Sequence, residues 1–387
     1  MPEVVLNTTS ENNGRPRVVV AMSGGVDSSV AAALLKQQGY DVTGMMMRLW
    51  SEPGRDADAP LNRCCTPDQM ADARRVAQQL DIPFYVVDVQ DYFRRTIVQF
   101  FIDEHEQGRT PNPCIECNRQ IRFSYLLDRA RALGADYLAT GHYARVRHEN
   151  GAYRLLKAVD SSKDQSYVLH VLGQEELAQV LFPLGEYVKD DVRAIAAQLR
   201  LPVAQKKESM DLCFLGDGDY RRFLREHASR ATGSGPIIGQ DGVVLGEHDG
   251  LAYYTIGQRK GLGISASEPL YVLYKDTVRN ALVVGSRQQL GQTELLVRDV
   301  NWVAGQPPHT SFRASVKIRY KATGAAATVH PLPDGQARVH FDDFVTGATP
   351  GQGAVFFDGD VCVGGGLIAD RRSAGAAEPS IPMSEIP

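Results

Sequence analysis

The sequence is poor in cysteine and lacks long hydrophobic runs. Six cysteines in 387 residues are too few for a disulfide framework. No apolar run is long enough to span a bilayer. The polar residues Met1–Pro16 also lack the apolar core of a secretion signal. These absences predict a soluble, cytoplasmic protein.

The sequence has no excess of charge of either sign. The formal net charge is −4, which argues against a nonspecific nucleic-acid coat. An RNA partner is compatible with this value, because phosphate binding depends on local basic patches rather than on the total. A hydrophobic fraction of 43% is typical of globular proteins, and the length predicts two or three domains.

The first half of the chain alternates short apolar runs with amphipathic stretches. Strands are expected at Arg17–Met22, Asp41–Leu49, Phe84–Val89 and Asp136–Thr140, and helices at Ser29–Gln38, Pro67–Leu80, Tyr92–Glu106 and Ser124–Leu133. This alternation predicts an α/β domain with a doubly wound parallel sheet over residues 1–216.

The pattern changes after about Gly216. One more helix is expected at Tyr220–His227, followed by short strands without helices at Leu270–Lys275, Ala281–Val284, Ser315–Arg319, Ala337–Phe341 and Ala354–Phe357. We expect a small central α+β domain at 217–290 and a C-terminal β-barrel at 291–370. The proline-containing tail, 371–387, is expected to be disordered.

Residues 21–29 read AMSGGVDSS and lie between the first expected strand and helix. Two glycines permit a tight turn, the serines add hydroxyl donors, and a helix N-terminus favours an anion. Asp27 would repel phosphate, so we interpret it as handling magnesium or substrate. The lysine of a Walker loop is missing, which excludes a kinase or GTPase loop. A ligand-free turn is the alternative, but the full motif after the first strand favours a phosphate site.

A pair of cysteines lies in the segment Gly108–Phe123, GRTPNPCIECNRQIRF. The prolines around Asn112 predict an extended, exposed loop rather than a helix, with Cys114 and Cys117 just beyond it. Nearby arginines, Arg119 and Arg122, are expected to lower the pKa of these thiols and so favour the reactive thiolate.

The remaining cysteines allow more than one interpretation. Cys213 follows two lysines in KKESMDLCFLG, which favours a thiolate, although a buried structural cysteine is equally compatible. Cys64 and Cys65 would complete a zinc knuckle with the C-x-x-C pair, but an adjacent pair is an unusual zinc spacing. Cys362 is most simply a small buried hydrophobe. The sequence leaves the roles of Cys64, Cys65 and Cys362 open.

The phosphate loop resembles that of the PP-loop ATP pyrophosphatases, which implies cleavage of ATP, with Mg²⁺, to AMP and pyrophosphate. Nearly the whole chain resembles the tRNA-specific 2-thiouridylase family, a bacterial group of sulfurtransferases. The motifs that carry this resemblance are AMSGGVDSS, GRTPNPxxxCN, LATGHY, DQSY, the Cys213 segment, TIGQRKGLG, KIRY, TPGQ and GGGL, in this order. The resemblance implies ATP-dependent 2-thiolation of uridine 34 in tRNA, with the first domain binding ATP and the barrel contacting tRNA.

The resemblance also implies roles for individual residues. It makes Cys117 the catalytic nucleophile and Cys213 the cysteine that carries a persulfide. The implied nucleotide site comprises Ala21, Met22, Ser23, Gly24, Gly25, Val26, Asp27, Ser28, Met47 and Gly141. The implied tRNA contacts are Asn112, Pro113 and Cys114 at the target base, and His142, Lys163, Asp164, Gln165, Arg319, Tyr320 and Gln352 elsewhere.

The implied chemistry has two forms. In the first, adenylation makes O2 of the uridine a good leaving group, and the persulfide sulfur of Cys213 replaces it with help from Cys117. In the second, Cys114, Cys117 and Cys213 hold a [4Fe–4S] cluster. Many family members have aspartate at the position of Cys114. The expected partners are the tRNAs for Lys, Glu and Gln and a sulfur-relay or cysteine desulfurase donor protein.

Two rival functions remain at this stage. An ATP-dependent amide synthetase of the same superfamily needs no paired thiols, so alkylation of its cysteines would leave it active. A zinc-stabilised RNA-binding module would hold zinc and release no pyrophosphate.

Overall fold

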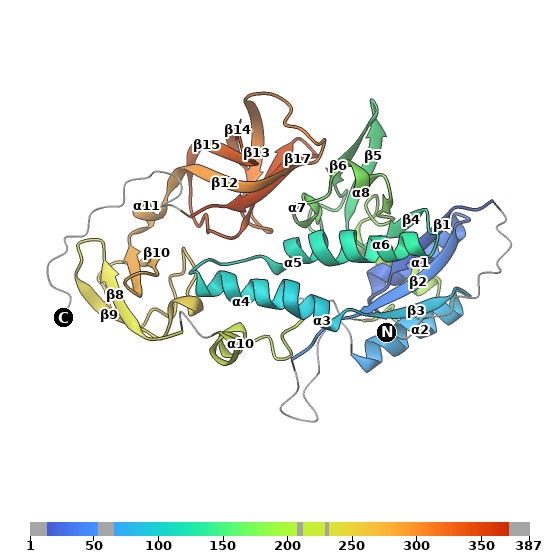
Figure 1. Cartoon of the computed structure of the whole chain (residues 1–387), viewed down its shortest axis with the longest axis horizontal. Helices are drawn as coiled ribbons and strands as arrows, with labels where there is room; N and C mark the ends of the chain where they lie inside the picture. The colour runs from blue at the N-terminus through green and yellow to red at the C-terminus, as the bar shows by residue number, and fades with distance from the viewer. Residues whose placement is uncertain (1–13, 53–65, 207–211, 229–231, 371–387) are drawn as a thin grey trace.

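A computed structural model describes residues 14–52, 66–206, 212–228 and 232–370. The expected disorder of 371–387 and the cysteines Cys64 and Cys65 lie outside the described residues. Figure 1 shows three parts, an N-terminal α/β domain, a central sheet, and a barrel that lies between them in the view. The predicted three-part α/β architecture is confirmed.

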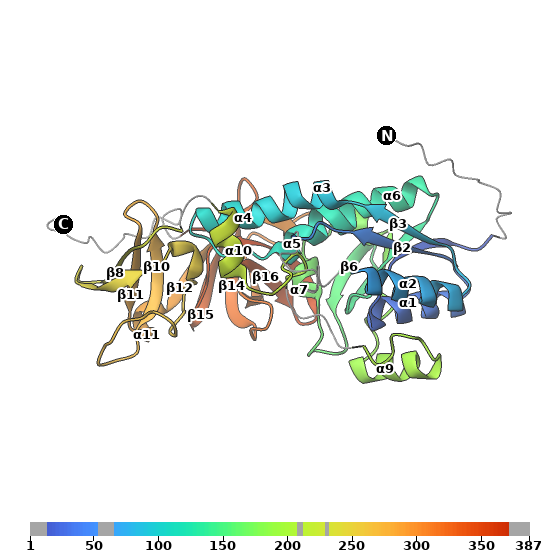
Figure 2. The same ribbon diagram turned by 90° about the horizontal axis from the view of Figure 1, so that it is seen from below.

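The N-terminal domain is built on a five-stranded parallel sheet in the order β3-β2-β1-β4-β7. Val18 and Val20 point into one hydrophobic cluster and Val19 into another, so both faces of β1 are buried. Figure 2 shows α1, α2 and α9 on one side of the sheet and α6 on the other. The strands are β1 (Arg17–Ala21), β2 (Asp41–Arg48), β3 (Phe84–Asp88), β4 (Tyr137–Ala139) and β7 (Val180–Leu181).

The helices of this domain include the four expected ones and others that were not predicted. They are α1 (Val26–Gln37), α2 (Pro67–Gln79), α3 (Gln90–Phe93), α4 (Gln99–Glu106), α5 (Pro113–Glu116), α6 (Leu127–Ala132), α7 (Ser166–Leu169), α8 (Gln174–Leu177) and α9 (Lys189–Gln198). The helices that were not predicted are α5, α7, α8 and α9. Two π-helical stretches, η1 (Arg94–Val98) and η2 (Cys117–Leu126), join α3 to α4 and α5 to α6.

The segment around Asn112 is extended, as expected, but it is not exposed, because Pro111 and Pro113 are buried and Asn112 is half-buried. A continuous helical segment that was not expected begins at Pro113 and includes both cysteines. Proline is well suited to the first position of a helix, where its missing N–H is not needed. The side chain of Asn112 caps this helix by accepting a hydrogen bond from Cys114 N at 3.1 Å.

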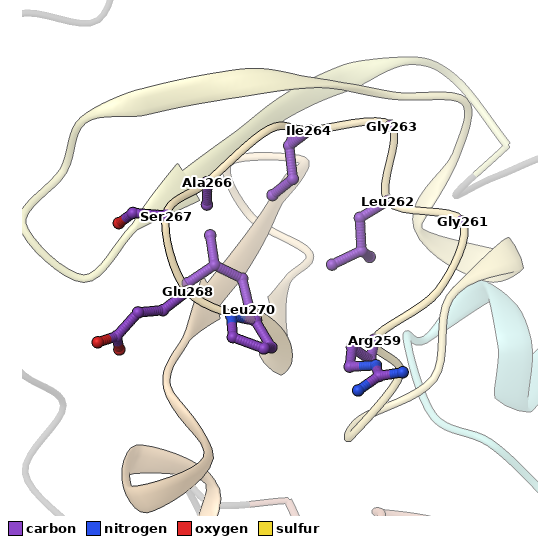
Figure 3. Close-up of a pocket in the computed structure, with 10 residues that line it drawn as sticks. Arg259, Gly261, Leu262, Gly263, Ile264, Ala266, Ser267, Glu268 and Leu270 are labelled. Atoms are coloured by element: carbon purple, nitrogen blue, oxygen red, sulfur yellow. The ribbon is translucent and has the colours of Figure 1, made fainter.

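The central domain contains a four-stranded sheet in the order β10-β11-β8-β9. Its elements are α10 (Tyr220–His227), β8 (Gly235–Gly239), β9 (Val244–His248), η3 (Leu251–Tyr253), β10 (Tyr271–Asp276), β11 (Ala281–Gly285) and α11 (Arg287–Leu290). A pocket of about 440 Å³ lies against the loop before β10, lined by residues such as Arg259, Leu262 and Leu270 (Figure 3). It contains none of the predicted site residues.

The C-terminal barrel is closed by pairing of β12 with β17. Its strands are β12 (Gln292–Trp302), β13 (Phe312–Lys317), β14 (Ala325–Leu332), β15 (Gln336–Val345), β16 (Gly353–Asp358) and β17 (Val361–Ile368). The sheet also continues into the N-terminal domain, because β17 pairs with β6 (Ala152–Lys157), which pairs with β5 (Ala144–Glu149). Among the described residues, no helix is long and apolar enough to cross a membrane.

Candidate active site

The glycine-rich loop lies at the carboxyl end of β1, where the strand order changes direction. The chain leaves β1 through α1 to reach β2 on one side, and β4 lies on the other side. Ligands of open α/β sheets bind at such a switch point. Gly141, just after β4, faces the start of α1, and a Cβ atom there would lie 2.8 Å from Ser28 N. Glycine therefore lets the two loops meet beside the helix N-terminus.

The serines of this loop hold it in a closed turn. Ser23 N donates to Ser28 Oγ at 3.0 Å, and the two hydroxyls are 3.2 Å apart. The hydroxyl of Ser29 donates to the Gly25 carbonyl at 2.8 Å. Gly24 has φ +69°, and a Cβ atom there would collide with the carbonyl oxygen of Gln69. The serine hydroxyls therefore hold part of the loop, and the close approach of Gln69 requires glycine at position 24.

Asp27 is held by two residues that sequence reasoning missed. Its carboxylate accepts hydrogen bonds from Lys189 Nζ at 2.6 and 2.8 Å and from Tyr143 OH at 2.9 Å. Lys189 is the first residue of α9 and is only 7% exposed. The ammonium offsets the negative charge of Asp27 beside the expected phosphate site. Tyr143 belongs to the LATGHY motif, whereas no local sequence signal identifies Lys189.

A second lysine contacts the loop directly. Lys206 Nζ donates to the Gly24 carbonyl at 2.9 Å and to Asp72 Oδ2 at 2.7 Å. Asp72 lies in α2, and its other oxygen accepts from Arg75 at 3.1 Å. Lys206 thus connects the phosphate loop, α2 and the segment that leads to Cys213.

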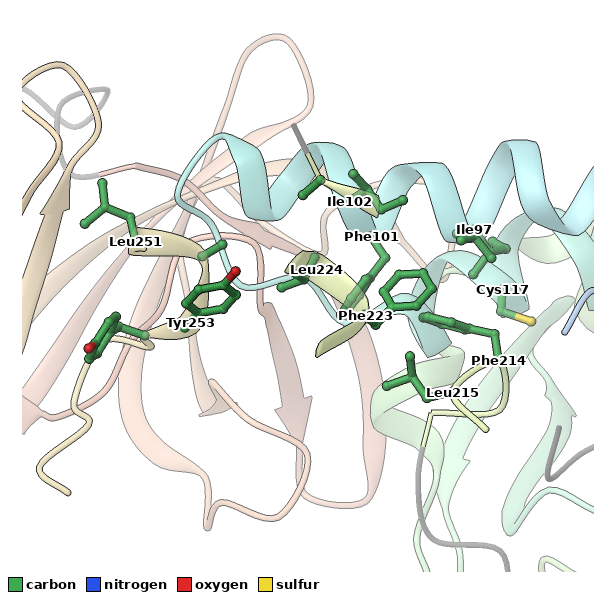
Figure 4. Packing of buried hydrophobic residues seen from close by; sticks show 14 of the residues in the cluster. Ile97, Phe101, Ile102, Cys117, Phe214, Leu215, Phe223, Leu224, Leu251 and Tyr253 are labelled. Atoms are coloured by element: carbon green, nitrogen blue, oxygen red, sulfur yellow. The ribbon is translucent and has the colours of Figure 1, made fainter. Parts of the chain in front are cut away.

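Cys117 and Cys213 belong to one hydrophobic cluster. Cys117 is buried, and Cys213 is partly buried against the same cluster, which also contains Phe214. Figure 4 shows the Cys117 side chain close to Phe214. Met47, the predicted nucleotide residue at the end of β2, packs against this cluster as well. One hydrophobic cluster therefore includes the two predicted sulfur residues and one residue of the predicted nucleotide site.

Cys114 differs from both of these cysteines because it is exposed. Within the described ranges, one group of three possible metal ligands has its donor atoms within 4.8 Å of one another, namely Glu52, Glu226 and His227. Arg222 donates to both carboxylates of that group, so it is an ion-pair cluster. The three candidate cysteines form no such group around a single ion.

The two arginines near the cysteines contact other side chains. Arg119 lies 3.2 Å from a carboxylate oxygen of Glu116. Arg122 donates to Asn118 Oδ1 at 3.1 Å and lies 3.4 Å from His142 Nε2. Their predicted effect on the pKa of the thiols stays a prediction.

His142 is buried beside these groups. Its Nδ1 lies 2.7 Å from the hydroxyl of Thr140. Burial, and secondly the positive charge of Arg122, hold the pKa of His142 well below its usual range. The imidazole is therefore neutral, with Nε2 accepting from Arg122 and Nδ1 donating to Thr140.

The turn containing Lys163, Asp164 and Gln165 supports the loop after β4. The Asp164 carboxylate is buried and accepts from Ala158 N at 3.1 Å and from the hydroxyl of Ser166 at 2.9 Å. Gln165 pairs with the main chain of Tyr143 through two hydrogen bonds, at 2.8 and 3.0 Å. These contacts position Tyr143, and through it Asp27.

The barrel holds the loop before Cys114. Gln352 Nε2 donates to the carbonyls of Thr110 at 2.8 Å and Pro111 at 3.2 Å. Thr110 N in turn donates to the Pro350 carbonyl at 2.9 Å. The predicted base-contacting segment that starts at Asn112 is therefore anchored to the C-terminal domain.

Arg319 and Tyr320 follow β13 on the barrel. Arg319 is exposed and donates to the Thr346 carbonyl at 3.2 Å. The ring of Tyr320 lies edge-on to that of Tyr167, with centroids 6.0 Å apart. The structure thus places a cation beside an aromatic ring on the side of the barrel that faces α7.

Comparisons with known proteins cover the whole described fold. Family models match at residues 16–217 (tRNA methyl transferase HUP domain), 221–286 (tRNA methyl transferase PRC-barrel domain) and 292–368 (aminomethyltransferase beta-barrel domain). The chain is 50% identical over 365 residues to the tRNA-specific 2-thiouridylase MnmA of Geotalea uraniireducens, covering 92% of this chain and 96% of that one. It is also 50% identical to the proteins of the same name from Moorella thermoacetica, over 90% and 98% of the two chains, and from Chloroflexus aggregans, over 91% and 98%.

Proposed function

The chain belongs to the tRNA-specific 2-thiouridylase family, and from this premise we propose how its own residues perform the reaction. It is a sulfurtransferase that forms 2-thiouridine in tRNA, with ATP as the activating substrate. The target that we propose is uridine 34, in the anticodon loop, where an unpaired base is accessible for extrusion into a pocket.

The observation that carries this proposal is the position of Met47. It lies near the end of β2, the strand that pairs with β1, and packs against the cluster that includes Cys117 and Cys213. An adenylated base held between the loop and this cluster would therefore lie next to the sulfur residues. No amide synthetase needs such a neighbouring pair of thiols.

We assign ATP to the predicted nucleotide residues, 21–28 with Met47 and Gly141. We expect the N–H groups at the start of α1 to bind the phosphates, while Lys189 offsets the negative charge of Asp27 beside them. Asp27 is a single carboxylate, which suits a Mg²⁺ ion that arrives on the nucleotide phosphates rather than one held in an all-protein cage. Bound there, Mg²⁺ would neutralise charge on the departing pyrophosphate.

Sulfur transfer follows adenylation. O2 of the uridine attacks the α-phosphorus of ATP, and pyrophosphate leaves. The terminal sulfur of the Cys213 persulfide then attacks C2, and AMP leaves with the oxygen. The Cys117 thiolate attacks Sγ of Cys213, which breaks the S–S bond, leaves the sulfur on C2 and forms a Cys117–Cys213 disulfide. A dithiol reductant must supply two electrons before the next turnover.

The tRNA contacts divide into two kinds. We propose that Asn112, Pro113 and Cys114 meet the target base, while His142, Lys163, Arg319, Tyr320 and Gln352 line its approach. Asp164 and Gln165 act by holding this surface in place, as His142 and Gln352 also do, because these side chains bond within the protein. The corresponding division of the chain is 1–216 for activation and sulfur transfer, 217–290 as the central domain and 291–370 for tRNA contact.

The remaining partners follow from the same chemistry. We propose the tRNAs for Lys, Glu and Gln as substrates and a sulfur-relay or cysteine desulfurase protein as the donor to Cys213. The alternative, a [4Fe–4S] cluster on Cys114, Cys117 and Cys213, is supported by the third thiol, which lies one helical turn before Cys117.

The test of the proposal is product analysis. The full chain is incubated with ATP, Mg²⁺, a sulfur source and unmodified tRNA, and nuclease fragments are searched for 2-thiouridine. We expect it at position 34 only, with tRNA-dependent pyrophosphate release. Gly24→Val and Asp27→Ala should abolish both while the far-ultraviolet circular dichroism stays that of wild type. Wild-type pyrophosphate release from either folded variant would refute the assignment of ATP to this loop.

A further inference from the structure

We propose that Lys206, held by Asp72, is a positioning residue that orients the peptide between Gly24 and Gly25 for binding the phosphates of ATP. The inference rests on the proposed location of ATP at this loop. It concerns two residues, Lys206 and Asp72, that lie outside the predicted nucleotide site.

The geometry of the peptide bond relates the Gly24 carbonyl, which Lys206 binds, to the N–H of Gly25. In a trans peptide, the C=O and the N–H point in opposite directions. Lys206 Nζ binds the Gly24 carbonyl at 2.9 Å from the side of α2. Fixing this oxygen toward Lys206 therefore turns the N–H of Gly25 the other way. Gly25 is the N-cap of α1, and its N–H is one of the donors available to an anion at this helix N-terminus.

The loop needs such a fixed point because glycine permits the peptide to rotate. Gly24 has φ +69°, a conformation that glycine leaves easily in either direction. The hydroxyl contacts of Ser23, Ser28 and Ser29 hold other atoms of the loop. Within the described chain, it is Lys206 that donates a hydrogen bond to the Gly24 carbonyl.

Asp72 sets the position of the ammonium. Its carboxylate lies 2.7 Å from Lys206 Nζ, and both side chains are partly buried, at 30% and 19% exposure. The pair neutralises most of the lysine charge, which makes Lys206 a poor direct ligand for phosphate. If Lys206 did bind phosphate directly, Asp72 would compete for it. If Lys206 orients the peptide, removing the Asp72 charge should weaken ATP binding. If Lys206 binds phosphate directly, removing that charge should strengthen ATP binding.

The test compares binding of ATP and of adenosine to the full chain by calorimetry. Lys206→Met should weaken ATP binding by about tenfold, the value of one charge-assisted hydrogen bond, and leave adenosine binding unchanged. Lys206→Arg should recover part of the loss. Asp72→Asn should also weaken ATP binding, and the double variant should be no worse than Lys206→Met alone.

Lys36→Met is the matched control. Lys36 also bonds main-chain carbonyls, those of Leu80 and Asp81, at the far end of α1. Lys36→Met should change the affinity for ATP by less than twofold, and it should lower the unfolding midpoint by as much as Lys206→Met does. Equal loss of ATP and adenosine binding in Lys206→Met would overturn the inference, as would tighter ATP binding by Asp72→Asn. A wild type that binds no ATP would instead refute the proposed function itself.

Discussion

A single residue, Cys114, distinguishes the two possible sulfur chemistries, persulfide transfer and a [4Fe–4S] cluster. It is exposed, whereas Cys117 is buried in the cluster that Cys213 joins. Persulfide transfer needs only the latter two thiols. A cluster needs the exposed one as a third ligand.

The replacement Cys114→Asp decides between these forms. We expect the variant to form 2-thiouridine in air, without iron, at a rate within about threefold of wild type. The reason is that Cys114 lies one helical turn before Cys117 and is exposed, so persulfide transfer between Cys213 and Cys117 does not need it. Iron content, visible absorption and product yield are measured on protein purified without oxygen. If wild type carries iron and the variant loses both iron and activity, the cluster mechanism holds instead.

Burial of Lys275 gives a second residue-scale prediction. Its Nζ and the Nδ1 of His105 are buried and have no hydrogen-bond partner among the described residues, although part of the lysine side chain reaches the surface. Burial lowers the pKa of Lys275 from 10.5 to about 7, and burial together with the Lys275 charge lowers that of His105 to about 3. The charged amine is therefore disfavoured in the folded protein.

The sign of the pH dependence follows from this shift. Between pH 7 and 10.5 the unfolded chain binds the proton that the folded chain has lost, so the Lys275 contribution to the free energy of unfolding rises with pH. Lys275→Met should increase that free energy at pH 7 by about 1–3 kcal/mol and flatten its rise toward pH 9.5. Urea unfolding at both pH values measures this. An unchanged slope would show that the amine stays solvated.

At the scale of elements, the sequence predicted those parts whose signals are local. The turn after β1, the amphipathic α2 and α10 all lie where the periodicity of the sequence predicted them. The helix at Pro113 was missed because proline was interpreted as a breaker, although it also starts helices. The β5–β6 hairpin was missed because ARVRHE is a polar strand, although the Asn150-Gly151 turn that joins it to β6 is a local hairpin signal. The pairing of β6 with the distant β17 had no such local signal.

Arg319 tests the predicted tRNA surface at the end of β13. Arg319→Ala should weaken tRNA binding several-fold and reduce the slope of log K against log salt by about one, because one phosphate contact is lost. Its hydrogen bond to Thr346 is on the surface, so the unfolding midpoint should change little. The affinity for ATP serves as the control. An unaltered salt slope would mean that Arg319 only supports its own loop.

At the scale of the whole molecule, the site depends on long-range contacts that no local sequence pattern predicts. Gln352 binds Thr110 and Pro111 across 242 and 241 residues of sequence, and Lys189 reaches Asp27 across 162. The sequence motifs predicted residues for the chemistry, whereas the side chains that support them were found only in the fold. The shared sheet of β17 and β6 couples the barrel to the domain that holds both cysteines.

The central claim is ATP-dependent transfer of sulfur from Cys213 with Cys117 as the second thiol. The most direct measurement loads Cys213 with an isotopically heavy persulfide and follows one turnover with ATP and unmodified tRNA. We predict heavy sulfur in 2-thiouridine, one AMP for each modified base, and a Cys117–Cys213 disulfide in the protein by mass spectrometry. Cys117→Ser should adenylate tRNA but release no thiolated product. Transfer of the label without ATP, or full thiolation by Cys213→Ser with the same donor, would contradict this account.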